Sequence, residues 1–204
     1  MNTDWDTVHS YDAAAAEYAA EAAAMPPWVA TEIDAFVETL GAAGRVLEIG
    51  SGGGRDALAF EQRGISIRRT DIAKGFVDLL RNDGFDADLL NPLSDDLTDP
   101  ARPGEPYDGI WACASLIHVA RADLGTVLER LALATRGGGP LHVSVRDGDG
   151  EHVSGSGGLR YVETYWREAP LKDTVAQAGW FVSEIRRYVG RPDDHWLSVR
   201  ATRE

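Results

Sequence analysis

The chain has 204 residues, enough for one α/β domain with a full hydrophobic core. Its 33 acidic and 20 basic residues give a formal net charge of -13, and an acidic surface repels phosphate backbones and anionic bilayers. We therefore expect neither a nucleic-acid substrate nor a membrane partner. The single cysteine, Cys113, allows no intrachain disulfide, and the acidic N-terminus does not resemble a signal peptide, so we expect a cytoplasmic protein.

The first forty residues are predicted to form two helices. Residues 10–24 consist largely of alanine and glutamate, which favour helix, and the pair Pro26 and Pro27 ends that segment. A second helix is expected from Trp28 to Leu40, just before Gly41.

Strands and helices alternate through the rest of the chain. The expected strands are 45–49, 65–70, 86–90, 107–113, 141–145, 180–189 and 196–201. The expected helices between them are 55–63, 74–82, one around 124–131 and 163–178. The last two strands are joined by a short turn at 190–194 and should be antiparallel. This pattern predicts a doubly wound, Rossmann-like α/β sheet with helices on both faces.

A glycine-rich turn follows the first expected strand. Glu48, Gly50, Gly52 and Gly54 form the pattern E-x-G-x-G-x-G. In a doubly wound sheet such a turn holds a nucleotide-like cofactor at the carboxyl end of the strand. The dinucleotide pattern G-x-G-x-x-G is not met, because Arg55 stands where its last glycine belongs. A turn without a ligand is the alternative.

Asp71 ends the second expected strand. A carboxylate at this place can accept hydrogen bonds from both hydroxyls of a ribose, which any nucleoside cofactor carries. Its alternative role is to cap the following helix.

Two later segments add candidate site residues. In residues 107–119 a strand leads into small side chains, among them Ala114, which leave room for a ligand beside the backbone. His118 follows and is our candidate general base, although a structural histidine remains an equal alternative. In residues 136–151 a glycine turn precedes a strand that ends near Arg146, before a glycine-rich loop.

Taken together, the motifs of residues 44–151 resemble those of the class I S-adenosylmethionine (SAM)-dependent methyltransferases. Residues 159–161 and 194–197 are also similar to a subgroup of small bacterial methyltransferases that includes tellurite-resistance-like proteins. The resemblance implies a seven-stranded sheet of order 3-2-1-4-5-7-6 with an antiparallel last hairpin. It also implies one domain, in which residues 1–42 form a helical cap over the cofactor site and 43–146 the SAM-binding core. Residues 147–204 would form an acceptor-side loop, a helix and the hairpin.

The resemblance implies SAM as the cofactor and S-adenosylhomocysteine as its product. Tyr11 and Tyr18 would close the pocket near the methionine carboxylate, Arg55 would pair with that carboxylate, and Leu90 and Asn91 would border the adenine. The full set of expected cofactor-binding residues is Tyr11, Tyr18, Glu48, Gly50, Ser51, Gly52, Arg55, Asp71, Ile72, Leu90, Asn91 and Ala114.

The acceptor is the least constrained part of the interpretation. Arg146 and Arg160 flank the glycine-rich loop, and two guanidinium groups suggest an anionic acceptor held by bidentate hydrogen bonds. We therefore expect a small, carboxylate-bearing metabolite methylated on oxygen. The candidate catalytic residues are His118, Arg146, Arg160 and Tyr161. The alternative is that both arginines pair with Asp147, Asp149 or Glu151. A carboxylate acceptor would leave His118 only a positioning role.

Three other functions stay open. They are a methyltransferase that detoxifies oxyanions such as tellurite, a non-catalytic SAM-binding protein, and a nicotinamide-dependent oxidoreductase, which Glu48 and Arg55 disfavour. The sequence presents no evident metal site, and both a monomer and a homodimer are compatible with it.

Overall fold

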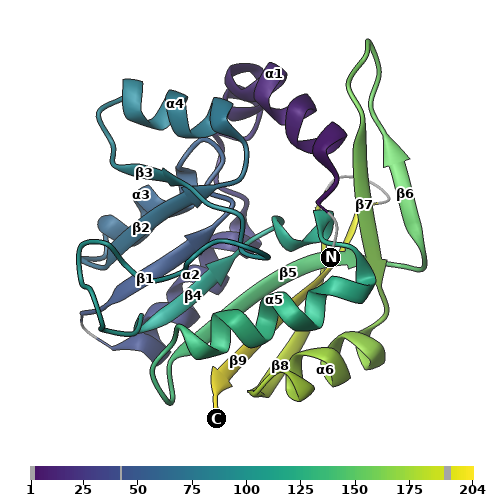
Figure 1. Cartoon of the computed structure of the whole chain (residues 1–204). Coiled ribbons are helices and arrows are strands. Elements are labelled where there is room, and N and C mark those ends of the chain that lie inside the picture. Colours follow the sequence, from purple (N-terminus) through teal and green to yellow (C-terminus); the bar gives the residue numbers. More distant parts are fainter. Residues whose placement is uncertain (1–2, 42, 191–193) are drawn as a thin grey trace.

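The computed structural model describes residues 3–41, 43–190 and 194–204, and a nine-stranded sheet lies at its centre (Figure 1). The strands are β1 (Arg45–Ile49), β2 (Ser66–Asp71), β3 (Ala87–Leu89), β4 (Gly109–Ala112), β5 (Pro140–Asp147), β6 (Glu151–Ser154), β7 (Tyr161–Trp166), β8 (Trp180–Val189) and β9 (His195–Arg203). The helices are α1 (Trp5–Glu21), α2 (Pro27–Leu40), α3 (Arg55–Glu61), α4 (Lys74–Asn82), α5 (Arg121–Leu133) and α6 (Glu168–Gln177), with a 3₁₀ turn η1 (Leu116–His118).

The main sheet runs β3-β2-β1-β4-β5 in parallel and continues into an antiparallel pair. From Pro140 to Arg146, β5 pairs with β9, which in turn pairs with β8. The predicted doubly wound sheet with an antiparallel last hairpin is therefore confirmed. The turn predicted at 190–194 falls largely on residues 191–193, which lie outside the described residues.

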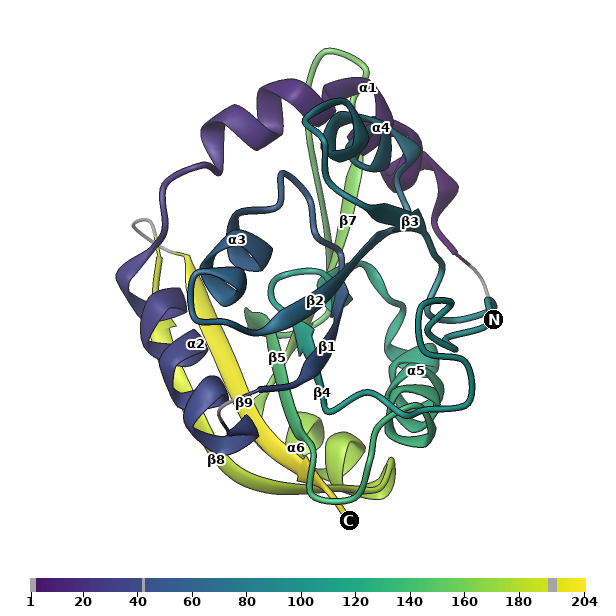
Figure 2. The same cartoon turned by 90° about the vertical axis from the view of Figure 1, so that its left-hand side faces the viewer.

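Helices cover both faces of the sheet, as the continuous apolar strands require (Figure 2). On one face, α2 and α3 pack against Val46, Ile67 and Trp111. On the other, α5 and α6 pack against the face that carries Leu47 and Val143. α1 stands apart from these layers and packs on α4 beside the carboxyl ends of the strands (Figures 1 and 2). Among the described residues no helix is long and apolar enough to cross a membrane.

The segment after β5 differs from the prediction. Residues 147–160 were expected to form a loop and 163–178 a helix, but β6 and β7 form an antiparallel hairpin here, with Val153 opposite Val162. The last residues of β7 also pair with the end of β5. The run from Tyr161 to Trp166 is rich in aromatic and β-branched side chains, which favour strand. The helix begins only at Glu168, because this start keeps Pro170 in its first turn, where a missing N–H costs nothing.

The N-terminal helix also begins earlier than predicted. It starts at Trp5 because the Asp4 carboxylate accepts hydrogen bonds of 3.1 Å from the backbone N–H groups of Asp6 and Thr7. This shift matters for the site, because it extends α1 across the cavity described next.

Candidate active site

A cavity of about 1230 Å³ opens at the carboxyl ends of β1, β2 and β4, beneath α1. In an open α/β sheet this is where strands 1 and 4 lead their loops to opposite sides and leave a crevice. Every expected cofactor-binding residue lines the cavity, and so do His118, Arg146 and Tyr161. Arg160 is absent from the lining among the residues that the structure describes.

The glycine turn forms the floor of the cavity. Gly50 and Gly52 have φ angles of 75° and 51°, in the left-handed region that favours glycine. A Cβ on Gly50 would lie 2.4 Å from Cβ of Ser115, so that position tolerates no side chain. A Cβ on Gly52 would meet nothing within 4 Å and would extend into open space. The turn is thus a cradle whose backbone a ligand can approach closely.

Two buried carboxylates border this cradle. Glu48 is 3% exposed, and its Oε2 accepts a hydrogen bond of 2.5 Å from Oγ of Ser51. Burial, reinforced by the neighbouring Asp56 carboxylate, raises the pKa of Glu48 to about 8. The two oxygens of Asp71 accept hydrogen bonds from the backbone N–H groups of Gly52 and Ala73, at 3.0 and 2.8 Å. Burial still raises the pKa of Asp71 to about 6.

Arg55 connects the cradle to the helical cap. Its Nε donates to Oδ1 of Asp56 at 2.7 Å, and its Nη1 donates to the carbonyl of Ala22, just after α1. The other oxygen of Asp56 accepts from the indole N–H of the buried Trp111 at 2.9 Å. Asp56 therefore holds the guanidinium at the edge of the cavity, where an incoming carboxylate can reach it.

Aromatic side chains from α1 form the roof. The ring of Tyr11 lies 5.3 Å from that of Tyr18, 5.8 Å from Phe76 on α4 and 4.7 Å from Tyr161 on β7, measured between centroids. Burial raises the pKa of the Tyr11 and Tyr18 hydroxyls, so both stay protonated at neutral pH.

His118 lies at the end of η1 and joins the roof to β7. Its Nδ1 is 2.7 Å from the carbonyl oxygen of Val162, and its Nε2 is 2.9 Å from Oη of Tyr11. Burial lowers the pKa of His118, and the hydrogen bond to Val162 only partly offsets this effect. The ring is therefore neutral at neutral pH, as a base must be before it accepts a proton.

The two arginines expected to clamp an anion do not meet. Arg146 lines the cavity, but its Nε lies 3.3 Å from Oε2 of Glu163 and its Nη1 pairs with Asp194. Arg160 turns the other way, and its Nη1 pairs with Oδ2 of Asp4 at 2.9 Å. The β6–β7 hairpin causes this separation, because it places Arg160 against the start of α1. Both arginines therefore pair with acidic residues, although with Glu163, Asp194 and Asp4 and not with the expected Asp147, Asp149 or Glu151.

The sequence analysis did not place Trp28, Glu163 or Asp194 in the site, yet all three line the cavity. The rings of Trp28 and Trp196 stack with centroids 6.1 Å apart, and the Arg146 guanidinium lies 4.0 Å from the centroid of Trp196. Tyr161 and Glu163 are two residues apart in a strand and so share one face. Alternation would have indicated Glu163 had residues 161–166 been recognised as a strand. Within the described parts of the chain, no group of His, Cys, Asp and Glu is arranged to hold a metal ion.

Comparison with known proteins adds a domain assignment to this geometry. Residues 46–139, from β1 to the turn before β5, match a family model described as a methyltransferase domain. This segment is therefore similar to methyltransferase domains. No curated protein sequence matches the chain.

Solved structures share the fold over most of its length. The 1,6-didemethyltoxoflavin-N1-methyltransferase of Burkholderia thailandensis, solved with 1,6-didemethyltoxoflavin and S-adenosylhomocysteine, is 21% identical, with a TM-score of 0.72, over 98% of this chain and 89% of that one. A SAM-dependent methyltransferase from Methanosarcina mazei is 12% identical with a TM-score of 0.73, over 88% and 98% of the two chains. The CcbJ methyltransferase of Streptomyces caelestis is 17% identical with a TM-score of 0.69, over 87% and 90%.

The domain match supports the prediction of a methyltransferase, and the neighbours solved with S-adenosylhomocysteine or SAM support the prediction of the cofactor. None of these matches bears on the tellurite-resistance-like subgroup, which stays a prediction. The roles of individual site residues also stay predictions, although the structure brings all but Arg160 to one cavity.

Proposed function

We propose that this methyltransferase transfers the methyl group of SAM to a small-molecule acceptor bound in the same cavity. One observation carries the proposal. The glycine cradle, with its two buried carboxylates, opens into the same space as the aromatic roof and His118. A single pocket for a small ligand measures about 300–1,000 Å³, so a cavity of about 1230 Å³ has room for a cofactor and a small acceptor side by side.

The residues at the cradle fit SAM. The open space above Gly52 admits a ligand against the backbone, and Asp71 retains lone pairs for the ribose hydroxyls. The side chains of Leu90, Asn91 and Ile72 would contact the adenine, while Arg55 and Tyr18 would hold the methionine carboxylate. SAM supplies a methyl group on a cationic sulfonium, and the buried carboxylate of Glu48, whose pKa burial raises to about 8, gains from a nearby positive charge.

The protein's own residues then provide orientation and exclusion of water. A methyl transfer in line gains most of its rate from proximity and alignment, which rigid walls supply. Tyr11, Tyr161 and His118 are held by contacts with one another and with β7, so the acceptor side is shaped before a ligand arrives. The small heterocycle bound by the Burkholderia methyltransferase supports an acceptor of similar size here.

A carboxylate-bearing acceptor, methylated on oxygen, has less support than a small-molecule acceptor in general. Its basis was a clamp of two arginines, and Arg160 faces Asp4 instead. Arg146 already pairs with Glu163 and Asp194. We therefore still propose a small-molecule acceptor, but not one whose carboxylate is held by both Arg146 and Arg160. We also propose a cytoplasmic location, because the single Cys113 forms no intrachain disulfide and suits a reducing compartment.

The test is formation of S-adenosylhomocysteine, followed by mass spectrometry, when the protein is incubated with SAM and a panel of small hydroxyl, amine, ring N–H and carboxylate compounds. We expect product heavier by one methylene group and one S-adenosylhomocysteine per product. The Asp71→Ala variant is the control and should lose most of this activity because it loses the ribose contact. Reduction or oxidation of a nicotinamide cofactor with no binding of SAM would contradict the proposal.

A further inference from the structure

We propose that Tyr11 and His118 form a proton relay, and that the acceptor therefore reacts through a neutral N–H or O–H group rather than through a carboxylate. The inference rests on the proposed methyl transfer and deepens it, because it names the chemical class of the reacting group.

The direction of the relay follows from the hydrogen bonds of His118. A backbone carbonyl only accepts, so the nitrogen that contacts the oxygen of Val162, Nδ1, must carry the ring hydrogen. In a neutral ring Nε2 then has a free lone pair, and Tyr11 Oη, 2.9 Å away, must be the donor. The Tyr11 oxygen keeps its own lone pairs to accept a proton from a group in the cavity that it lines.

The surroundings of His118 allow it to hold the proton that it receives. Burial keeps the ring neutral at rest, whereas the carboxylates of Glu163 on β7 and Asp4 before α1 favour the protonated ring, and Arg146 on β5 opposes it. The Val162 carbonyl fixes the ring orientation throughout. A ring held in one tautomer, with its free lone pair aimed at a hydroxyl, is the arrangement of a general base and not of an anion anchor.

The charge of the cavity wall near His118 and β7 also favours an acceptor with a neutral N–H or O–H group. Among the described residues lining the side with His118 and β7, Asp4, Glu17, Glu163 and Asp194 are acidic. Asp4 is paired with Arg160, and the cation Arg146 is already paired with Glu163 and Asp194. A carboxylate acceptor would face this negative charge without a free partner, and it would have no proton for Tyr11 to take. A neutral planar compound instead finds the rings of Tyr161, Trp28 and Trp196 along the wall.

The proton and electron balance is simple. A lone pair of the acceptor nitrogen or oxygen forms the bond to the methyl carbon, and the pair of the breaking carbon–sulfur bond stays on sulfur. The acceptor's own proton passes to Tyr11 Oη while the Tyr11 proton passes to His118 Nε2, and the electrons of the broken X–H bond stay on the acceptor atom. The positive charge thus ends on the imidazole, which later releases the proton to water.

The first measurement needs no turnover. Protein labelled with ¹⁵N in its histidine rings is saturated with S-adenosylhomocysteine and examined by NMR at pH 7. We expect His118 as the neutral ring with hydrogen on Nδ1, and a shift of its Nε2 signal in the Tyr11→Phe variant, which removes the donor. Hydrogen on Nε2, or a charged ring at pH 7, would overturn the relay.

The second measurement compares three fused bicyclic acceptor probes of similar size: 2-naphthol, indoline and 2-naphthoate. We expect methylation of the hydroxyl or N–H probe, and a fall in kcat of about 100-fold or more in Tyr11→Phe and His118→Gln, the range of general base catalysis. Tyr165→Phe and His152→Gln are matched controls outside the cavity lining and should keep the parent kcat. Methylation of 2-naphthoate at a rate that His118→Gln does not change would overturn the inference.

Calorimetric titration with SAM separates the two levels of failure. Loss of SAM binding by the parent protein would contradict the proposed function itself. Intact SAM binding together with the wrong tautomer or with base-independent methylation of a carboxylate would contradict the relay alone.

Discussion

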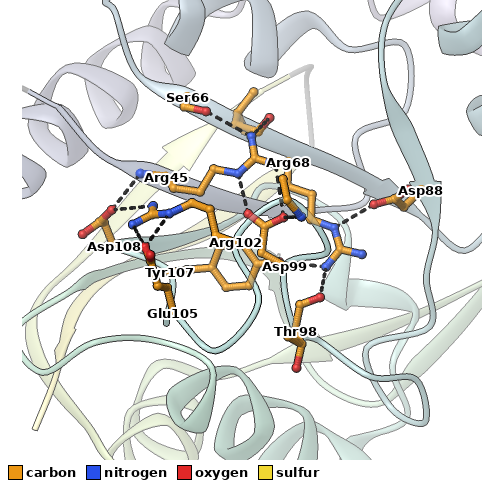
Figure 3. A network of polar contacts seen from close by, with 12 residues as sticks. Arg45, Ser66, Arg68, Asp88, Thr98, Asp99, Arg102, Glu105, Tyr107 and Asp108 are labelled. Atoms are coloured by element: carbon orange, nitrogen blue, oxygen red, sulfur yellow. Dashed lines mark hydrogen bonds and ion pairs between the residues drawn. The ribbon is translucent and has the colours of Figure 1, made fainter.

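The parallel sheet has one edge where its strands begin and one where they end, and the pKa values of buried carboxyl groups shift in opposite directions at these two edges. Where β1 begins, Arg45 Nε donates to the buried Asp99 at 2.7 Å, and in the same network Arg68 Nε donates to the half-exposed Asp88 at 2.8 Å (Figure 3). Burial alone would raise the pKa of Asp99, but the hydrogen bond and charge of Arg45 lower it below its usual value. At the other edge, the hydrogen bond from Ser51 and the charge of Arg69 only partly offset the burial of Glu48, and backbone hydrogen bonds only partly offset that of Asp71. Their pKa values therefore rise to about 8 and about 6.

This difference distinguishes buried carboxylates that stabilise the fold from those that are available to bind a ligand. A buried acid that is fully paired adds to the cohesion of the fold, whereas one left short of positive charge costs stability until a ligand supplies that charge. We therefore read the starting edge of the strands as the stabilising edge and the finishing edge as the site for a cationic cofactor.

The largest effect is expected from the stabilising edge. In Arg45→Met the carboxylate of Asp99, 1% exposed, loses its cation, and we expect the free energy of unfolding to fall by about 3 kcal/mol in urea titrations. The affinity for SAM should stay within about twofold, because the change lies at the far end of β1. Lys74→Met removes an exposed ion pair with Asp78 and is the control, with about 0.5 kcal/mol. Equal effects of the two variants would show that the edge network is not stabilising.

The next effect concerns the cofactor edge. Asp71→Asn removes the charged acceptor for the ribose hydroxyls, and we expect SAM affinity to fall by a factor of about 30, or about 2 kcal/mol for hydrogen bonds to a charged group. Calorimetry measures this directly. An unchanged dissociation constant would mean that Asp71 serves only to hold the backbone of Gly52 and Ala73.

The two edges should also differ in their response to pH. Glu48 and Asp71 bind a proton more tightly in the folded than in the unfolded chain, so their contribution to stability is full below about pH 4. It is lost as the pH rises through about 6 for Asp71 and about 8 for Glu48. Asp99 has a lowered pKa, so its contribution is present at neutral pH and is lost in acid. We expect Glu48→Gln to flatten the decline of ligand-free stability between about pH 5 and about pH 8. A decline as steep as that of the parent protein in urea titrations would exclude Glu48 as its cause.

The smallest effect is expected at Arg160. It pairs with Asp4 near the surface and does not line the cavity in the described structure. Arg160→Ala should therefore leave both SAM affinity and the KM of the acceptor within about twofold, since exposed ion pairs contribute little. A tenfold rise in acceptor KM in this variant would instead show that Arg160 contributes to acceptor binding.

The site residues that could be predicted from the sequence are those whose positions follow from local spacing along the chain. Glu48, Gly50 and Asp71 stand at the ends of parallel strands, and such ends meet at one edge whatever the rest of the chain does. His118 follows a strand end in the same way. Each of these residues lines the cavity.

The remaining features depend on pairing between distant segments. The β6–β7 hairpin forms because its strands pair with each other and with the end of β5, and this pairing turned Arg160 away and brought Glu163 in. The contact of Tyr11 with His118 joins residues 107 positions apart and exists only because α1 packs across the strand ends. Propensity and motif spacing do not contain such information.

The most direct test of the central claim is calorimetric titration of SAM into the protein at about pH 6 and about pH 8.5, with S-adenosylhomocysteine and NAD as comparisons. We predict one SAM per chain and an affinity about tenfold higher at the upper pH, because Glu48 must lose its proton to pair with the cation. S-adenosylhomocysteine has the same amino-acid moiety without the sulfonium and should depend less on pH, as should SAM with Glu48→Gln. Binding of NAD instead of SAM, or SAM affinity equal at both pH values, would contradict the account.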